Sequence, residues 1–110
     1  MTENDRLYLQ HIQESIAWIE KYTSSGREHF MESHLTQDGV IRNFEIIGEA
    51  VKRISDETLG ETPQIPWSRI SRFRDVLIHG YMNIELTEVW NVIEDHIPAL
   101  KQAVIQLLEK

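Results

Sequence analysis

Apolar residues recur at steps of three and four positions along most of the chain, and no other feature limits the fold as strongly. Val40, Phe44, Ile47, Val51 and Ile54 form one such series, and this spacing places its members on a single face of a helix. No segment alternates apolar and polar residues with the period of two that half-buried strands have. The spacing therefore predicts an all-α protein.

Four long amphipathic helices and one short helical turn account for this periodicity. We predict the turn at residues 27–33 and the long helices at about residues 4–23, from 36 or 38 to 59, 66–81 and 85–108. Connections this short join antiparallel neighbours. A chain of 110 residues is the size of one domain, so we expect residues 1–110 to form a single antiparallel up-and-down helical bundle.

Individual glycines and prolines refine this prediction. Gly48 lies in mid-helix, where glycine costs about 1 kcal/mol relative to alanine, and we interpret it as room for another helix to approach closely. Gly60 stands where a helix would end in the left-handed conformation. Pro66 suits the first residue of the third helix. Pro98 should kink the fourth helix, because it has no amide to donate to the carbonyl of Glu94.

Composition excludes several classes of protein. The chain has no cysteine, which excludes a disulfide framework and a thiolate metal site. Its histidines show no metal-ligand spacing such as H-E-x-x-H, so we expect neither a metal nor another cofactor. No apolar run approaches the roughly 18 residues of a membrane span, and the polar N-terminal residues do not have the apolar core of a signal peptide. We expect a cytoplasmic protein that does not enter a membrane.

A net positive charge is confined to one short segment. The net charge is −7, whereas a non-specific nucleic-acid binder normally has a basic surface. Residues 67–82 are the exception, with three arginines and one aspartate, and the segments on either side are acidic. This distribution favours a local anion site over an extended basic groove.

The positive segment also contains a histidine. Arg69, Arg72 and Arg74 precede His79 on the third predicted helix. A guanidinium group holds a phosphate through two hydrogen bonds, and a histidine is the side chain that ordinarily titrates near neutral pH. With Arg74 to hold charge and His79 to move a proton, these are the minimum parts for breaking a phosphodiester without a metal. Arg69 and Arg72 then belong to a solvated or RNA-contacting face.

These residues and several others resemble a known family. Arg74, four intervening residues, His79 and then Tyr81 match the R-x4-H-x-Y pattern of the HEPN superfamily of small helical ribonucleases. Three further segments resemble its HepT-like toxin branch: Ile41-Arg42-Asn43-Phe44-Glu45-Ile46-Ile47-Gly48-Glu49-Ala50, Ile65-Pro66-Trp67 and Val89-Trp90. The resemblance runs from about Leu7 to Leu107. One departure is Asp75, which stands where the family often has asparagine.

The resemblance implies a specific biological role. HepT-like proteins are the toxin half of a toxin–antitoxin module, and the antitoxin is a minimal nucleotidyltransferase that transfers AMP to the motif tyrosine. Carried over, Arg74 and His79 would be catalytic in RNA cleavage and Tyr81 would be the AMP acceptor. The implied partners are the RNA substrate and the cognate nucleotidyltransferase.

On a regular helix, Arg74 and His79 do not lie on the same face. Five positions on an ideal helix rotate by about 500°, so the two side chains point about 140° apart. The helix could be distorted near Gly80, the long arginine could reach round, or the site could be assembled across a two-fold homodimer. We expect a homodimer, because one histidine does not easily serve as both the base and the acid that RNA cleavage requires.

Two further expectations concern the surroundings of this site. Asp75 lies one turn before His79 and could orient it through a hydrogen bond. Arg42 and Glu49 share a helical face and form either a polar interface that supports the bundle or part of the cleft.

Two function classes fit these observations. The first is a metal-independent endoribonuclease toxin. The second is a non-catalytic helical module that binds a nucleotidyltransferase or its substrate, since Arg74 could simply pair with a carboxylate and His79 could be an ordinary surface histidine. A transcriptional regulator fits poorly, because no recognition helix with base-reading side chains is visible.

Overall fold

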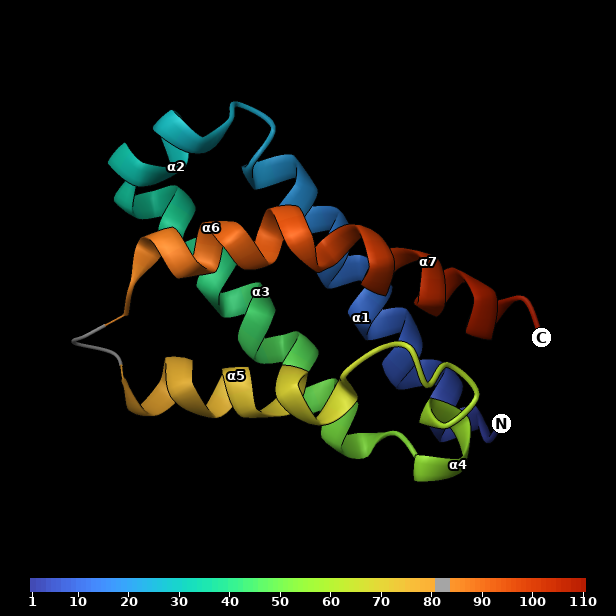
Figure 1. The fold of residues 1–110 in the computed structure, drawn as a ribbon. Coiled ribbons are helices and arrows are strands. Elements are labelled where there is room, and N and C mark those ends of the chain that lie inside the picture. Colours follow the sequence, from blue (N-terminus) through green and yellow to red (C-terminus); the bar gives the residue numbers. More distant parts are fainter. Residues whose placement is uncertain (81–83) are drawn as a thin grey trace.

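Every regular element in the described part of the chain is a helix. The structure, a computed structural model, describes residues 1–80 and 84–110. Its helices are α1 (Glu3–Tyr22), α2 (Arg27–Glu32), α3 (His34–Arg53), α4 (Asp56–Leu59), α5 (Trp67–His79), α6 (Leu86–Asp95) and α7 (Ile97–Leu108) (Figure 1). The predicted all-α fold is confirmed.

The bundle is built on one central pair of helices. α1 and α3 pack against each other along most of their length, α5 packs on α3, and α7 packs on α1. The chain reverses direction between α1, α3, α5 and the α6–α7 segment, as Figure 1 shows. This alternation is the up-and-down arrangement that the short connections predicted.

The predicted apolar stripes form the core. Val40, Phe44, Ile47, Val51 and Ile54 are all buried, which confirms the stripe on the second helix. The other long helices also contribute buried apolar side chains, among them Ile12, Ile16, Ile19, Leu77, Val89, Ile97, Leu100, Val104 and Leu107. Burial of these faces is the main force that holds the helices together.

The second long helix ends earlier than its periodicity predicted. α3 stops at Arg53, and Ile54 and Ser55 are extended, with ψ of 140° and 146°. The cause is a contact from α1: the Asp5 carboxylate accepts hydrogen bonds from the Ser55 amide at 2.9 Å, the Ser55 hydroxyl at 2.7 Å and the Thr58 hydroxyl at 2.6 Å. Ser55 also caps the short helix α4. A partner 50 residues away in sequence therefore interrupts the helix.

Gly60 was also predicted wrongly. It has φ −64° and ψ −16°, a right-handed conformation that any residue adopts. Pro66 is the residue that caps α5, one position before the helix begins at Trp67. The third helix ends at His79, and Tyr81, which the predicted helix included, lies outside the described residues.

Pro98 interrupts the last helical segment more strongly than a kink. α6 ends at Asp95 and α7 begins at Ile97, so the segment is two helices that meet at His96. Pro98 lies in the first turn of α7, where its missing amide costs nothing. The position of the predicted interruption is confirmed.

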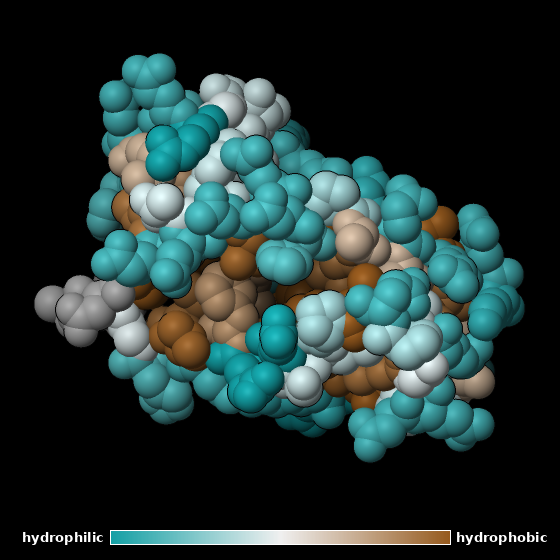
Figure 2. Space-filling model, viewed as in Figure 1, coloured by the Kyte–Doolittle hydropathy of each residue, from teal (hydrophilic) through white to brown (hydrophobic). Residues whose placement is uncertain are grey.

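An apolar hollow separates α5 from the α6–α7 segment. It measures about 400 Å³, and its lining includes Phe44, Ile70, Phe73, Val92 and Leu100. Figure 2 shows an open depression with a hydrophobic floor on this face. Because α5 is not packed tightly against α6–α7, its position depends mainly on its contact with α3.

Gly48 makes that contact close. A Cβ atom built on Gly48 would lie 2.3 Å from the Cβ of Arg74, a distance that real Cβ atoms do not show. The Arg74 Cβ is fixed to the backbone of α5, so the two helices can meet here only because residue 48 has no side chain. The prediction that Gly48 admits another helix is confirmed.

We expect Gly48→Ala to lower the free energy of unfolding by about 1–3 kcal/mol, because overpacking must push α5 away from α3. This loss would outweigh the roughly 1 kcal/mol that alanine gains in helix propensity. Urea unfolding followed by circular dichroism measures the change.

Gly39→Ala is the matched control, since Gly39 lies on the same helix and a Cβ there would meet only the Tyr22 ring, at 3.0 Å. Tyr22 is exposed, so its ring can move aside and the variant should be as stable as the parent or slightly more so. Equal stability of the two glycine variants would contradict the steric role of Gly48.

The stability of the fold depends on the ionisation of Asp5, and therefore on pH. Burial raises the pKa of the Asp5 carboxyl, but the hydrogen bonds from Thr58, Ser55 and Thr2 outweigh it and hold the pKa well below its ordinary value. Because this pKa is lower in the folded state, the ionised carboxylate stabilises the fold at pH values above the unfolded-state pKa of about 3.9. This stabilisation is lost as the pH falls below that value.

We expect Asp5→Asn to lower the free energy of unfolding at pH 7 by about 1–3 kcal/mol, because it weakens hydrogen bonds to a charged acceptor. The difference between parent and variant should shrink as the pH falls from about 4 toward 2. Parallel unfolding curves across this pH range test it, and a constant difference would show that the Asp5 charge does not matter.

Candidate active site

Arg74 lies against α3, and its guanidinium is held by two carboxylates. Nη2 of Arg74 lies 3.3 Å from Oε2 of Glu49, and Nη1 lies 3.2 Å from Oδ1 of Asp75. The side chain is 26% exposed, and its Nε is buried without a hydrogen-bond partner among the described residues. The arginine is therefore fixed in place by α3, yet it retains donors that a bound anion could use.

Asp75 joins the same network from the other side. Its Oδ1 accepts a hydrogen bond from Nζ of Lys52 at 2.8 Å. The pKa of the Asp75 carboxyl lies below its ordinary value because Lys52 donates this bond, and Arg74 adds to the effect. Asp75 was predicted to orient His79, but the described residues contain no hydrogen bond between them. The tertiary contact with Lys52 takes its place.

His79 is on a different side of α5. It is the last residue of the helix, and it is exposed. Val76 and Arg72 lie about one and two turns before it, respectively, on the same face, and both are exposed. Val76 is 62% exposed, so an apolar side chain sits between a guanidinium and an imidazole on the open surface. Within one chain, α5 remains regular as far as His79 and turns Arg74 and His79 in different directions.

Arg74 lines a small hollow between α1, α3 and α5, which we call the Arg74 pocket. The pocket measures about 190 Å³, and His79 is not among its lining residues. Arg42 and Glu49 line it, and they also form ion pairs with Glu45 and Arg74, so both of their predicted roles stay open. The other lining residues are Tyr8, His11, Glu45, Ile46, Ala50 and Ile78.

His11 is the residue that sequence reasoning missed. Its ring packs edge-to-face on the Tyr8 ring, with centroids 5.3 Å apart, and both rings line the Arg74 pocket. His11 directly precedes the buried Ile12 of the core stripe. That position puts it at the edge of the face with which α1 contacts α3. The neighbouring core residue is therefore the feature of the sequence that could have indicated where His11 lies.

The remaining sequence-based expectations have the following outcomes. Tyr81, the expected AMP acceptor, lies outside the described residues. Within residues 1–80 and 84–110, no group of three or more histidine, aspartate or glutamate side chains is placed to hold a metal ion. No helix in the described ranges is long and apolar enough to cross a membrane.

Comparisons with known proteins point to one family. Residues 12–107 match the family model described as ribonuclease HepT-like. Over 102 residues, 39% are identical to a Thermococcus cleftensis protein named "Probable ribonuclease HepT", covering 92% of this chain and 93% of that one. A Methanocaldococcus jannaschii protein named "Gamma-glutamylcyclotransferase and putative RNase" is 40% identical over 111 residues, and this chain spans only 50% of its length. No solved structure gives a significant match.

Proposed function

Because this chain belongs to the ribonuclease HepT-like family, we propose that it is a metal-independent endoribonuclease that uses Arg74 and His79. The family model matches residues 12–107 of this 110-residue chain, and family membership rests on that match.

RNA supplies its own nucleophile, the 2′-hydroxyl group. Cleavage requires a base that takes the 2′-hydroxyl proton, an acid that gives a proton to the departing 5′-oxygen, and positive charge beside the crowded phosphate. The 2′-oxygen forms a bond to phosphorus as the bond to the 5′-oxygen breaks. The products are a 2′,3′-cyclic phosphate and a free 5′-hydroxyl. DNA has no 2′-hydroxyl, so it should not be cut.

The observation that carries this proposal is the family match, together with an Arg74 guanidinium that Glu49 and Asp75 hold in place. The separation of Arg74 from His79 on α5 then determines how the site has to be assembled. Arg74 faces the Arg74 pocket, whereas His79 faces solvent beside Arg72 and the exposed Val76. Because one chain does not bring these side chains together, the proposed homodimer packs two copies so that both His79 side chains and the partner's Arg74 reach one cleft. One His79 then serves as the base and the partner's His79 as the acid, while the arginines hold the phosphate.

The contacts of Arg74 suit this role. Glu49 and Asp75 fix the guanidinium without using all five of its N–H donors. Holding the cation in place before the phosphate arrives reduces the reorganisation that the reaction needs. Asp75 is itself neutralised by Lys52, so the aspartate adds less negative charge to the phosphate site than an isolated carboxylate would.

The same contacts also support a second candidate, a non-catalytic module that binds a nucleotidyltransferase or its substrate. In that case the pairing of Arg74 with Glu49 and Asp75 is purely structural, and it joins α5 to α3. His79 would then be a surface residue without a role in chemistry.

We expect the purified protein to cleave RNA in EDTA and to leave 2′,3′-cyclic phosphate ends. His79→Ala should lower the rate by about 10²–10⁴-fold, because it removes the proton transfer. Arg74→Ala should lower it by about 10²–10³-fold, because it removes charge stabilisation. Full activity in both variants, or activity only with added metal, would reject the mechanism and favour the binding module.

Mixing the parent with excess His79→Ala separates a shared site from two independent ones. If both histidines act in one cleft, each mixed dimer is inactive, and a 1:3 mixture should lower the activity per parent chain to about one quarter. Unchanged activity per parent chain would place the whole reaction within a single copy.

The proposal includes control by a nucleotidyltransferase antitoxin that adds AMP to Tyr81. Tyr81 follows His79 by two positions, so an AMP group there would bring bulk and negative charge next to the histidine. Both effects oppose the approach of RNA.

We expect the cognate nucleotidyltransferase and ATP to increase the mass of the protein by whole AMP units and to stop RNA cleavage. Tyr81→Phe removes only the acceptor hydroxyl, so this variant should keep its activity and resist inactivation. Mass spectrometry and the cleavage assay measure both results, and inactivation of Tyr81→Phe to the same extent would locate the control elsewhere.

A further inference from the structure

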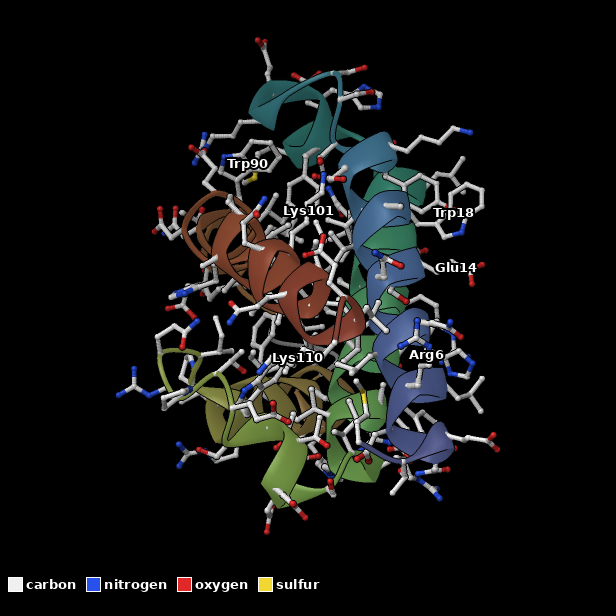
Figure 3. The ribbon with its side chains drawn as sticks, turned by 90° about the vertical axis from the view of Figure 1, so that its right-hand side faces the viewer. Arg6, Glu14, Trp18, Trp90, Lys101 and Lys110 are labelled. Atoms are coloured by element: carbon white, nitrogen blue, oxygen red, sulfur yellow. The ribbon has the colours of Figure 1, made fainter. Side chains whose placement is uncertain are left out.

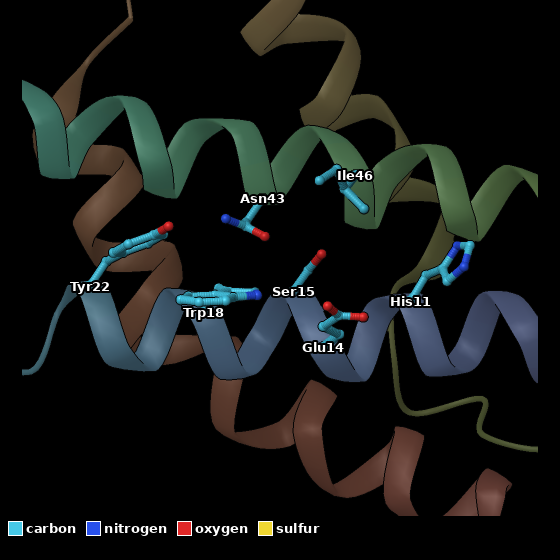
Figure 4. A pocket seen from close by; sticks show the side chains of 7 residues that line it. All are labelled: His11, Glu14, Ser15, Trp18, Tyr22, Asn43 and Ile46. Atoms are coloured by element: carbon cyan, nitrogen blue, oxygen red, sulfur yellow. The ribbon is translucent and has the colours of Figure 1, made fainter.

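A second hollow continues from the Arg74 pocket along the seam between α1 and α3. It measures about 350 Å³ and is lined by Glu14, Ser15, Trp18, Tyr22 and Asn43. It also shares two lining residues, His11 and Ile46, with the Arg74 pocket. We call the two hollows together the α1–α3 groove; Figure 4 shows the part that extends from His11 to Tyr22.

One end of the groove is an exposed aromatic stack. The rings of Trp18 and Tyr22 stack with centroids 5.7 Å apart and an angle of 25° between their planes. They are 41% and 38% exposed, whereas Trp67 and Trp90 are each only 7% exposed. Figure 3 shows Trp18 projecting from the outer side of α1, and Nζ of Lys21 lies 5.1 Å from the centroid of its ring. Exposed aromatic rings beside a cation are the usual platform for unpaired nucleobases.

The floor of the groove offers hydrogen-bonding groups that the described chain does not use. Ser15 is 3% exposed and Asn43 is 8% exposed. The Asn43 amide donates to the carbonyl of Gly39 at 2.8 Å, which leaves its Oδ1 available, and the Ser15 hydroxyl has no hydrogen bond to any described residue. Figure 4 shows both oxygens in the space between α1 and α3. Neither oxygen is a fully buried atom without a partner, so both reach the open space of the groove and are available to a ligand with polar edges.

The carboxylates determine which part of a nucleotide fits here. Glu45 pairs with Arg42 at 3.9 Å, and Glu49 pairs with Arg74 at 3.3 Å, whereas Glu14 has no ion pair within the described residues. An unpaired carboxylate repels a phosphate but accepts hydrogen bonds from amino groups, as acidic side chains do with cytosine. Bases therefore face the middle of the groove, and phosphates lie toward the arginines at its other end.

We infer that the α1–α3 groove binds unpaired nucleobases of the RNA substrate next to the phosphate held by Arg74. Trp18 and Tyr22 stack on the bases, and Glu14 with Oδ1 of Asn43 selects a base that carries an amino group over uracil. This inference rests on the proposed function, because RNA is its ligand. In this arrangement α1 recognises the single-stranded RNA, and α5 carries the residues that cleave it.

The test uses labelled oligonucleotides that cannot be cleaved because every 2′-hydroxyl is methylated. Fluorescence anisotropy with the full chain should show tighter binding of the adenine oligomer than of the uracil oligomer. Trp18→Leu should weaken binding of the adenine oligomer about tenfold, since it removes a stacked ring. Leu35→Ala is the matched control, because Leu35 is 85% exposed and lies outside the groove, and this variant should bind like the parent.

A second variant isolates base selection from folding. Glu14→Gln keeps the size of an exposed side chain but removes its charge. It should therefore reduce the ratio of the affinity for the adenine oligomer to the affinity for the uracil oligomer. With cleavable RNA, Trp18→Leu should raise KM about tenfold and leave kcat unchanged. Unchanged KM and binding in Trp18→Leu, or equal binding of both oligomers by the parent, would overturn the groove assignment.

These measurements can reject the ribonuclease mechanism and the groove assignment independently of each other. If the parent binds the oligomers through Trp18 but cleaves no RNA, the groove stands and the ribonuclease mechanism fails. If the parent cleaves RNA and Trp18→Leu does so with the same KM, the mechanism stands and the groove fails. Binding of a protein to the Trp18 face, with no effect of Trp18→Leu on RNA affinity, would also reject the groove as an RNA site.

Discussion

The close approach of α5 to α3 at Gly48 determines how the functional surface is arranged. A side chain at residue 48 would collide with the Cβ of Arg74, so the missing side chain lets the backbone of Arg74 lie directly on α3. Glu49 then reaches the guanidinium, and Lys52 reaches Asp75. A steric contact fixes the distance between the helices, and the charged groups hold their rotation.

This rotation gives the two faces of α5 different roles. With Arg74 turned toward α3, the period of the helix places His79 on the opposite, exposed side next to Val76. The same rotation also brings Arg74 to one end of the groove between α1 and α3. One helix–helix contact therefore decides both the separation of Arg74 from His79 and the position of Arg74 at the groove.

Local patterns in the sequence predicted the parts of the structure that depend on helical period. The buried stripe from Val40 to Ile54, the close approach at Gly48 and the interruption near Pro98 are all found. The early end of α3 was not predicted, because Ser55 leaves the helix to bind Asp5, which is 50 residues away in sequence. The partner of Asp75 was missed for the same reason, since Lys52 lies on another helix.

The sequence by itself determined that this chain forms helices, which faces of them are buried, and which family it belongs to, because periodicity and short motifs are properties of neighbouring residues. Only the tertiary structure decided which residues share a surface. It joined Arg74 to Glu49, separated it from His79 and placed His11 and Trp18 along one groove. The physical reason is that these relations depend on the packing of whole helices, and packing is decided by the fit of side chains that lie far apart in the sequence.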